Sequence, residues 1–270
     1  SYLLRKYLTN HWFYCHNGPK PDFMSKSDDV YLGAKVVLTP RAEKGFGMYQ
    51  KAKELAEAND WFLAQQFETS ANSDIHAATT GQEILGDFSG QNLDYFVTGY
   101  GTGGTVTGGA RVLRDKLPDT KIILSEPSNA ALVTSGHAQE RNATGQPSVS
   151  HPHFEPHPIQ GWTPDFIPLV LQEAIDNGLY DELLKVNGAD GIHWAKRLAS
   201  EEGIFTGVSG GSSLAVAVEV AKSAPDGSNI LCMLPDTGER YLSTPLFDGI
   251  EEEMSTDEIA LSHSTPGYHL

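Results

Sequence analysis

The sequence predicts an α/β protein in which a parallel sheet carries helices on both faces. From about residue 32 onward, apolar segments of strand length alternate with segments of helical spacing. The strand segments are nearly continuous in apolar residues, which is typical of strands buried on both faces. Because parallel strands need a crossover between them, the intervening helices are expected to cover the sheet.

The elements are expected in the following order along the chain. Strands are predicted at residues 34–38, 62–67, 93–98, 121–124, 182–186 and 229–234. Helices are predicted at residues 44–58, 73–85, 190–201 and 211–222, with one more running from a glycine loop to residue 116. In the first of these helices, Met48, Ala52 and Ala56 fall on one stripe, as an amphipathic helix requires. A long irregular region is predicted from 126 to 162, and an irregular arm over residues 1–30.

Composition excludes some classes of partner. The 270 residues contain 19 Lys plus Arg against 35 Asp plus Glu, a formal net charge of −16. Such a chain repels nucleic-acid phosphates and anionic membrane surfaces, so neither is expected to bind. No apolar run reaches the length of a membrane span. Two cysteines far apart in sequence do not indicate a disulfide scaffold, which favours a soluble protein in a reducing compartment.

The segment "GYGTGGTVTGG", residues 99–109, lies between a predicted strand and a predicted helix. Unpaired backbone amides and the helix dipole make such a helix start an anion site, and glycine lets the main chain approach closely. Thr102, Thr105 and Thr107 add hydroxyl donors. The loop therefore predicts a phosphate site.

Three other interpretations of this glycine-rich loop are a P-loop, a dinucleotide-binding loop and a turn without a ligand. A P-loop requires a Gly-Lys-Ser/Thr ending, and no lysine follows here. The dinucleotide fingerprint is matched loosely by Gly101, Gly103 and Gly108, and Glu126 stands at the end of the next strand, where that fingerprint expects an acidic residue. A tight turn without a ligand is the third possibility.

A more specific match comes from the family of pyridoxal-phosphate enzymes of fold type II. "GTGGT" (residues 101–105) resembles the phosphate cradle of cysteine synthase (O-acetylserine sulfhydrylase) and cystathionine β-synthase. Four further segments resemble the family in the family's order: "QQFETSANSDIHAATTGQEI" (65–84), "HPIQGWTPDFIP" (157–168), "GIFTGVSGGSS" (203–213) and "PDTGERYLSTPLF" (235–247). The resemblance begins at about Met24, and it fits the cysteine-synthase branch better than the cystathionine β-synthase branch.

The resemblance implies roles for individual residues. Those expected to bind the cofactor phosphate are Gly101, Thr102, Gly103, Gly104 and Thr105. Ser209 is expected to bond the pyridine nitrogen, Gln66 to contact the substrate carboxylate, and Gly161 to lie near the incoming amino acid. Without the family, Ser209 is interpreted as an ordinary N-cap serine of the helix at 211–222, and the two interpretations are compatible.

The resemblance also implies domain boundaries, and it shows which motif of the family carries the Schiff-base lysine. Residues 31–68 are expected to be a remnant of the small domain, and 69–270 the large cofactor-binding domain with a C-terminal tail. The family holds its cofactor as a Schiff base on a lysine in a stretch like Ser-Val-Lys-Asp-Arg, and meets the substrate with a Ser-Gly-Asn-Thr-Gly loop; neither motif occurs here. Lys26 in "SKSDD" follows Met24 directly, where the family has a surface helix. No residue is therefore assigned as catalytic.

Two functions follow as expectations. The first is a cysteine-synthase-like protein (O-acetylserine plus sulfide giving cysteine) that is inactive on its own and need not bind pyridoxal phosphate. The alternative is a non-catalytic structural or interaction subunit of a larger assembly; a binding module for a nicotinamide dinucleotide ranks third. Another subunit or a second copy is expected to cover the sheet and the small domain.

A histidine-rich stretch, "HPHFEPHP", offers one more candidate site. His151, His153 and His157 with Glu155 could hold a metal, since side chains two apart in an extended segment share a face. Solvated histidines are the preferred interpretation, and no metal is assigned.

Overall fold

The computed structural model describes residues 2–5, 12–17, 30–31, 33–251 and 253–264. Its larger sheet has the strand order β7-β6-β5-β8, and every neighbouring pair is parallel. The strands are β5 (Tyr95–Gly99), β6 (Lys121–Pro127), β7 (Glu182–Val186) and β8 (Ile230–Cys232). This arrangement confirms the predicted parallel α/β fold.

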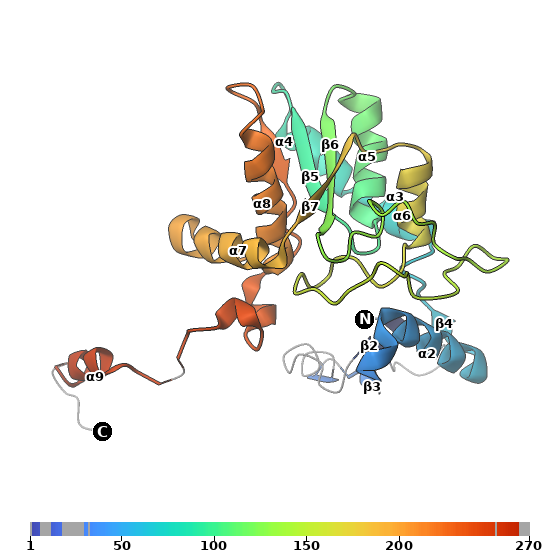
Figure 1. Ribbon diagram of the computed structural model, residues 1–270, viewed down its shortest axis with the longest axis horizontal. Helices are drawn as coiled ribbons and strands as arrows, with labels where there is room; N and C mark the ends of the chain where they lie inside the picture. Colours follow the sequence, from blue (N-terminus) through green and yellow to red (C-terminus); the bar gives the residue numbers. More distant parts are fainter. Residues whose placement is uncertain (1, 6–11, 18–29, 32, 252, 265–270) are drawn as a thin grey trace.

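Helices cover both faces of this sheet (Figure 1). On one side lie α3 (Ser70–Ala78), α4 (Thr80–Asp87), α5 (Gly104–Lys116) and α6 (Leu169–Asp176). On the other lie α7 (Gly188–Glu202) and α8 (Val208–Ala221). Successive strand residues point to opposite faces. Phe96 and Ile122 accordingly belong to the core beside α5, and their neighbours Val97 and Ile123 to the core beside α8.

A second, smaller sheet is built from the N-terminal part of the chain, in the order β3-β2-β1-β4. Its strands are β1 (Tyr2–Arg5), β2 (Trp12–Asn17), β3 (Lys35–Thr39) and β4 (Phe62–Leu63). Strands β2 and β3 are parallel, and β1 is antiparallel to both of its neighbours. The irregular arm predicted for residues 1–30 is therefore wrong for β1 and β2. Pairing with distant strands supplies hydrogen bonds that no local pattern reveals.

Helix α2 (Lys44–Asn59) packs beside this smaller sheet and builds a separate core. Its buried face carries Met48, Ala52 and Ala56, which confirms the predicted stripe, together with Tyr49. Phe67 and Phe166 complete this core, and their rings meet edge to face with centroids 5.0 Å apart. Because Phe166 comes from the long segment after β6, it ties that segment to α2.

Several boundaries differ from the sequence prediction. The single helix predicted at 73–85 is two helices, since the chain breaks at Thr79 with φ −120° and ψ −78°. Helix α6 was not predicted, although Pro168 directly precedes it as a helix-start signal. The domain boundaries at 30, 68 and 69 stay a prediction.

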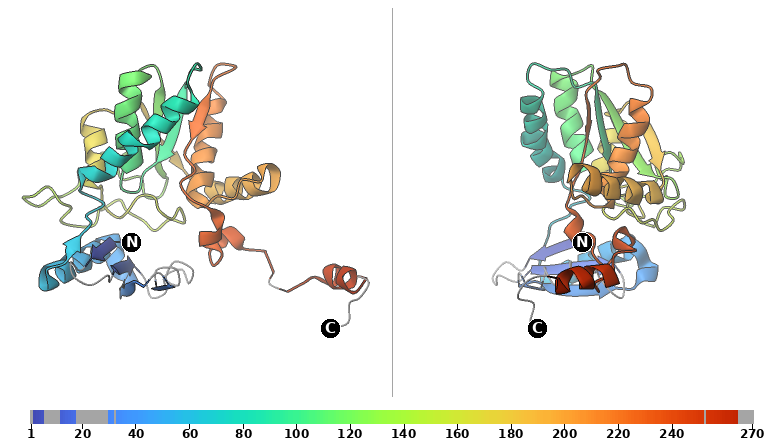
Figure 2. Two further views of the ribbon diagram at one scale, coloured as in Figure 1. Left: turned by 180° about the vertical axis from the view of Figure 1, so that it is seen from behind. Right: turned by 90° about the vertical axis from the view of Figure 1, so that its left-hand side faces the viewer.

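The C-terminal part continues as η2 (Gly238–Tyr241), η3 (Pro245–Phe247) and α9 (Thr256–His263). Helix α9 stands clear of the rest of the molecule in Figure 1 and in the left-hand view of Figure 2. No helix in the described ranges is both long and apolar enough to cross a membrane.

Candidate functional site

A cavity of about 250 Å³ lies at the carboxyl end of β5, between the glycine loop and α8. Its lining residues are Thr98, Gly99, Gly101, Thr102, Thr105, Gln160, Gly161, Trp162, Ser209, Ser213, Met233, Pro235 and Asp236. Two larger hollows, of about 470 and 520 Å³, lie along α7, away from the carboxyl ends of β5 and β8 and from the glycine loop. Ligands of open α/β sheets bind at the carboxyl ends of the strands, so the smaller cavity is the better candidate.

The glycine loop, residues 99–104, is shaped by close contacts that leave no room for a Cβ at its glycines. Gly103 is the N-cap of α5 with φ +91°, and a Cβ there would lie 2.6 Å from Leu171 Cα. At Gly101 a Cβ would lie 2.2 Å from the carbonyl oxygen of Gly161. The loop thereby brings the first amides of α5 to the cavity, where an anion can accept their hydrogen bonds.

Thr102 is oriented for a ligand by Asn72 of α3. The Asn72 side-chain amide donates to Thr102 Oγ1 at 2.9 Å, and Gly104 N donates to the same oxygen at 3.2 Å. Since Thr102 accepts both bonds, its own hydroxyl proton is left for a group inside the cavity. Asn72 was given no role in the sequence analysis.

His76 plays a similar part toward Thr105. Its Nε2 lies 3.3 Å from Thr105 Oγ1, and its Nδ1 lies 3.0 Å from Thr80 Oγ1. Burial lowers the pKa of His76, so the ring is neutral and has one donor and one acceptor nitrogen. The sequence analysis missed this residue too. The four-residue spacing of Asn72 and His76 on one helix face was the available signal.

The opposite wall comes from α8, which presents hydroxyl groups. Helix α8 begins at Val208 with Gly207 as its N-cap, so the interpretation of Ser209 as an N-cap serine is wrong. Ser209 instead lies in the first turn and lines the cavity together with Ser213. The only ionisable side chain among the described lining residues is Asp236, and burial raises its pKa.

Residues 157–168 close the cavity from the side, and we call them the gating stretch because they resemble the segment with that role in the family. Thr163 N donates to Tyr100 O at 2.7 Å, which ties the stretch to the glycine loop. His157 Nε2 lies 3.1 Å from Thr163 O, and burial lowers the pKa of this histidine. Thr163 has φ +35°, a conformation that a β-branched residue rarely adopts. Contacts on both sides therefore hold a strained backbone in place.

Asp165 connects the gating stretch to α2. One carboxylate oxygen accepts from Phe46 N at 2.8 Å, and the other accepts from the Ser150 hydroxyl. The N-cap residue of α2, Glu43, makes no side-chain capping bond, so Asp165 supplies a cap from 119 residues away. The side chain is only 1% exposed, and burial raises the pKa of its carboxyl.

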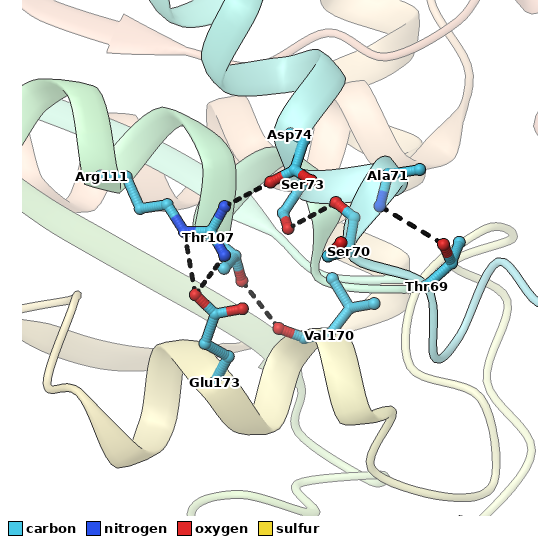
Figure 3. Close-up of polar contacts among 9 residues, drawn as sticks. All are labelled: Thr69, Ser70, Ala71, Ser73, Asp74, Thr107, Arg111, Val170 and Glu173. Atoms are coloured by element: carbon cyan, nitrogen blue, oxygen red, sulfur yellow. Dashed lines mark hydrogen bonds and ion pairs between the residues drawn. The ribbon is translucent and has the colours of Figure 1, made fainter.

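Figure 3 shows how the helices behind the cavity are joined. Arg111 of α5 donates to Glu173 of α6 through Nε at 2.9 Å and to Asp74 of α3 through Nη1 at 2.8 Å. Thr107 donates to the carbonyl oxygen of Val170 at 2.9 Å. The sequence prediction of Thr107 as an anion donor is therefore wrong, because its position on α5 turns the hydroxyl toward α6.

The structure brings most of the sequence-predicted site residues together. Those that line the cavity are Gly101, Thr102, Thr105, Gly161 and Ser209. Gly103 and Gly104 shape the start of α5 behind them. Gln66 is adjacent through its carbonyl oxygen, which accepts from Asn72 Nδ2 at 2.7 Å, but it is not a lining residue. Lys26 lies outside the described residues, and the described lining residues include no lysine.

Two alternative interpretations lose their support. Glu126 is fully buried; its carboxylate accepts from the Tyr100 hydroxyl at 2.8 Å and from Val133 N and Thr134 N. It therefore cannot reach a nucleotide ribose. Among the residues that the structure describes, no group of His, Cys, Asp or Glu is arranged to hold a metal ion.

The preferred interpretation of the histidine-rich stretch as solvated is wrong for His151, which is 1% exposed. Its Nε2 lies 3.0 Å from His137 O, and its Nδ1 accepts from His153 N at 3.2 Å. Both ring nitrogens of His151 are thus used within the protein.

Comparisons with known proteins agree with this geometry. A family model described as pyridoxal-phosphate dependent enzyme matches residues 24–236. The O-ureido-L-serine synthase of Streptomyces lavendulae is 44% identical over 220 residues, 82% of this chain and 62% of that protein. A cysteine synthase of Staphylococcus aureus is 40% identical over 230 residues, 84% of this chain and 68% of that protein.

Solved structures give the same result. A crystal structure of O-ureido-L-serine synthase is similar with a TM-score of 0.80 and 40% identity, covering 92% of this chain and 72% of that one. The cysteine synthase of Entamoeba histolytica has a TM-score of 0.74 and 28% identity, covering 93% of this chain and 68% of that one.

Proposed function

Because the chain belongs to the fold-type-II family of pyridoxal-phosphate-dependent enzymes, we propose that its cavity binds pyridoxal 5′-phosphate for β-replacement on an O-substituted L-serine. One observation carries the proposal: the glycine loop and the α8 hydroxyls line a single cavity of about 250 Å³. In pyridoxal 5′-phosphate a single methylene carbon joins the phosphate group to the ring. The donors for the phosphate and the donors for the ring must therefore lie close together, as the glycine loop and the α8 hydroxyls do.

The loop fits the phosphate group of this cofactor. At Gly101 and Gly103 a Cβ would collide with backbone atoms, so only glycine allows the loop conformation that brings the first amides of α5 to the cavity. Thr102 keeps its hydroxyl proton for such an oxygen. Thr105 does the same when Thr80 donates to His76 Nδ1 and His76 Nε2–H donates to Thr105. Backbone dipoles and hydroxyls thus replace a lysine or arginine.

The α8 wall fits the ring. Ser209 would bond the pyridine nitrogen with a neutral hydroxyl, and Trp162 would exclude water from the ring face. When bound, the cofactor supplies an electron sink for electrons released at the substrate's α-carbon. Gly161, at φ +84°, would let the gating stretch approach the substrate, and Gln66 would contact the substrate carboxylate from beside the cavity.

The presence or absence of a lysine amine beside the cofactor decides between catalysis and binding alone. Since none of the described lining residues is a lysine, we propose that this 270-residue chain alone binds the cofactor without turning over substrate. The same observation favours the second candidate function, a non-catalytic subunit of an assembly.

A titration of the purified chain with pyridoxal 5′-phosphate tests the binding proposal. Quenching of tryptophan fluorescence, to which Trp162 contributes, is expected to saturate and to be reversed by inorganic phosphate, because the loop holds the phosphate group. Gly86→Ala, on the exposed side of α4, is the control that should bind unchanged. Absence of saturable binding by the intact chain would reject the cofactor site.

Borohydride reduction of the loaded chain, followed by peptide mapping, tests the catalytic half. The expected map shows no stoichiometric adduct, and no cysteine forms from O-acetyl-L-serine and sulfide. A single modified lysine together with turnover would make this chain an active β-replacement enzyme instead.

A further inference from the structure

Ser213 is a buried hydroxyl that the protein itself leaves without a partner. It is 1% exposed, lines the cavity, and its Oγ has no hydrogen bond among the described residues. Its neighbour Ser212 behaves as helix serines ordinarily do, donating to Val208 O at 2.8 Å. A buried polar atom without a partner costs free energy, so Ser213 indicates a ligand group or a ligand-bound partner inside the cavity.

The position of Ser213 relative to Ser209 limits what that partner can be. The two serines are four residues apart on α8 and both line the cavity. Residues at this spacing face the same side of a helix, with Cβ atoms about 5–6 Å apart. Hydroxyls turned toward each other across that distance can form one hydrogen bond.

A pyridine nitrogen has one in-plane lone pair and so accepts one strong hydrogen bond. Two hydroxyls on the same wall must therefore serve it in series rather than together. A hydroxyl that accepts a hydrogen bond becomes a better donor, because bonds in a chain polarise one another.

We infer that Ser213 is a positioning residue for the ring nitrogen of the cofactor: its hydroxyl donates to Ser209 Oγ, which directs the Ser209 proton to the nitrogen. This inference rests on the proposed function. This arrangement makes the cavity bind a phosphorylated ring with a nitrogen acceptor more tightly than a phosphorylated ring without one.

Binding of two probes to the full chain tests this. Pyridoxine 5′-phosphate has the ring nitrogen and no aldehyde, so it reports only non-covalent contacts; benzyl phosphate has a phosphate and a ring without nitrogen. Ser213→Ala is expected to weaken pyridoxine 5′-phosphate by about three- to tenfold and to leave benzyl phosphate unchanged. Ser212→Ala, an equally buried serine on the same helix, should change neither.

A double variant separates positioning from direct contact. In a Ser209→Ala background, Ser213→Ala is expected to cause no further loss, because the group through which it acts is gone. Equal weakening of both probes, an additive loss in the double variant, or wild-type binding by Ser213→Ala would each overturn the inference while leaving the cofactor site standing. Failure of the wild type to bind either probe would instead overturn the proposed function and this inference with it.

Discussion

The glycine loop and the gating stretch form adjoining walls of the cavity, yet they are held in opposite ways. The glycine loop keeps its shape because its glycines lack side chains: Gly99, Gly101 and Gly104 each lie where a Cβ would meet another atom at 2.2 Å or less. Residues 157–168 keep theirs because polar side chains are buried, notably His157 and Asp165.

This difference predicts two kinds of sensitivity. A wall built from close backbone contacts fails when atoms are added. Changes in pH have little effect on it, because burial raises the pKa of its one ionisable side chain, Tyr100, well above the ordinary value. A wall built from buried polar groups loses stability when one of these groups is substituted or changes its protonation state, so its stability depends on pH. Substitutions in the glycine loop, in the gating stretch and at Arg111, which joins α5 to α6, separate these two kinds of sensitivity.

The largest effect is expected for Gly103→Ala in the glycine loop. An alanine there must adopt φ +91° and place its Cβ 2.6 Å from Leu171 Cα. Left-handed backbone costs about 1–2 kcal/mol and overpacking about 1–3 kcal/mol, so the free energy of unfolding should fall by roughly 2–5 kcal/mol. Urea denaturation measures this loss.

Gly86→Ala is the matched control, because its Cβ would meet nothing within 4 Å and it lies within α4. Removing a helix glycine at an open position should stabilise the protein by about 0.5–1 kcal/mol. Similar unfolding free energies for the two variants would show that the loop tolerates side chains, and the contrast between the walls would fail.

The next effect is a pH dependence at Asp165 in the gating stretch. Burial raises the pKa of this carboxyl in the folded state. Its contribution to stability is therefore fully present below the carboxyl's ordinary pKa and is lost as pH rises through the raised pKa. Asp165→Asn keeps an acceptor for Phe46 N and cannot ionise, so its unfolding free energy relative to wild type should improve as pH rises.

The magnitude follows from linkage, at about 1.4 kcal/mol for each unit by which the pKa is raised. Urea unfolding of both proteins over a series of pH values gives the difference directly. Asp87→Asn, at the exposed end of α4, provides the control and should run parallel to wild type. A parallel profile for Asp165→Asn as well would mean that the carboxyl titrates normally.

The sequence predicts the glycine-loop wall far better than the gating wall. Strands β5 and β6 and helix α5 follow from local apolar runs. The phosphate loop at Gly101 follows from its glycine pattern, and a resemblance in short motifs adds Ser209. Asp165 and Phe46 are 119 residues apart, so no periodicity could pair them. Thr107 shows the limit within one motif: its residue type suits a phosphate loop, but its angular position on α5 faces Val170.

The smallest effect is expected for the link between the walls. Arg111 joins α5, which follows the glycine loop, to α6, which follows the gating stretch, and its partners are Glu173 and Asp74 (Figure 3). The side chains of Arg111, Glu173 and Asp74 are 32%, 35% and 58% exposed, so solvent and salt screen the ion pairs. Arg111→Met should lower the free energy of unfolding by about 0.5–1 kcal/mol, and less at 1 M salt.

Arg197→Met removes a comparable exposed pair, with Glu201 at i,i+4, that joins nothing beyond α7. The loss of this pair should have a smaller effect on the free energy of unfolding than Arg111→Met, because solvent screens it fully. The useful comparison is the cofactor affinity of the two variants: if Arg111 couples the walls, Arg111→Met weakens pyridoxine 5′-phosphate binding slightly, whereas Arg197→Met leaves it unchanged. Equal affinities would mean that the helices hold the two walls in register by apolar packing alone, chiefly through Leu171 in the core beside α5.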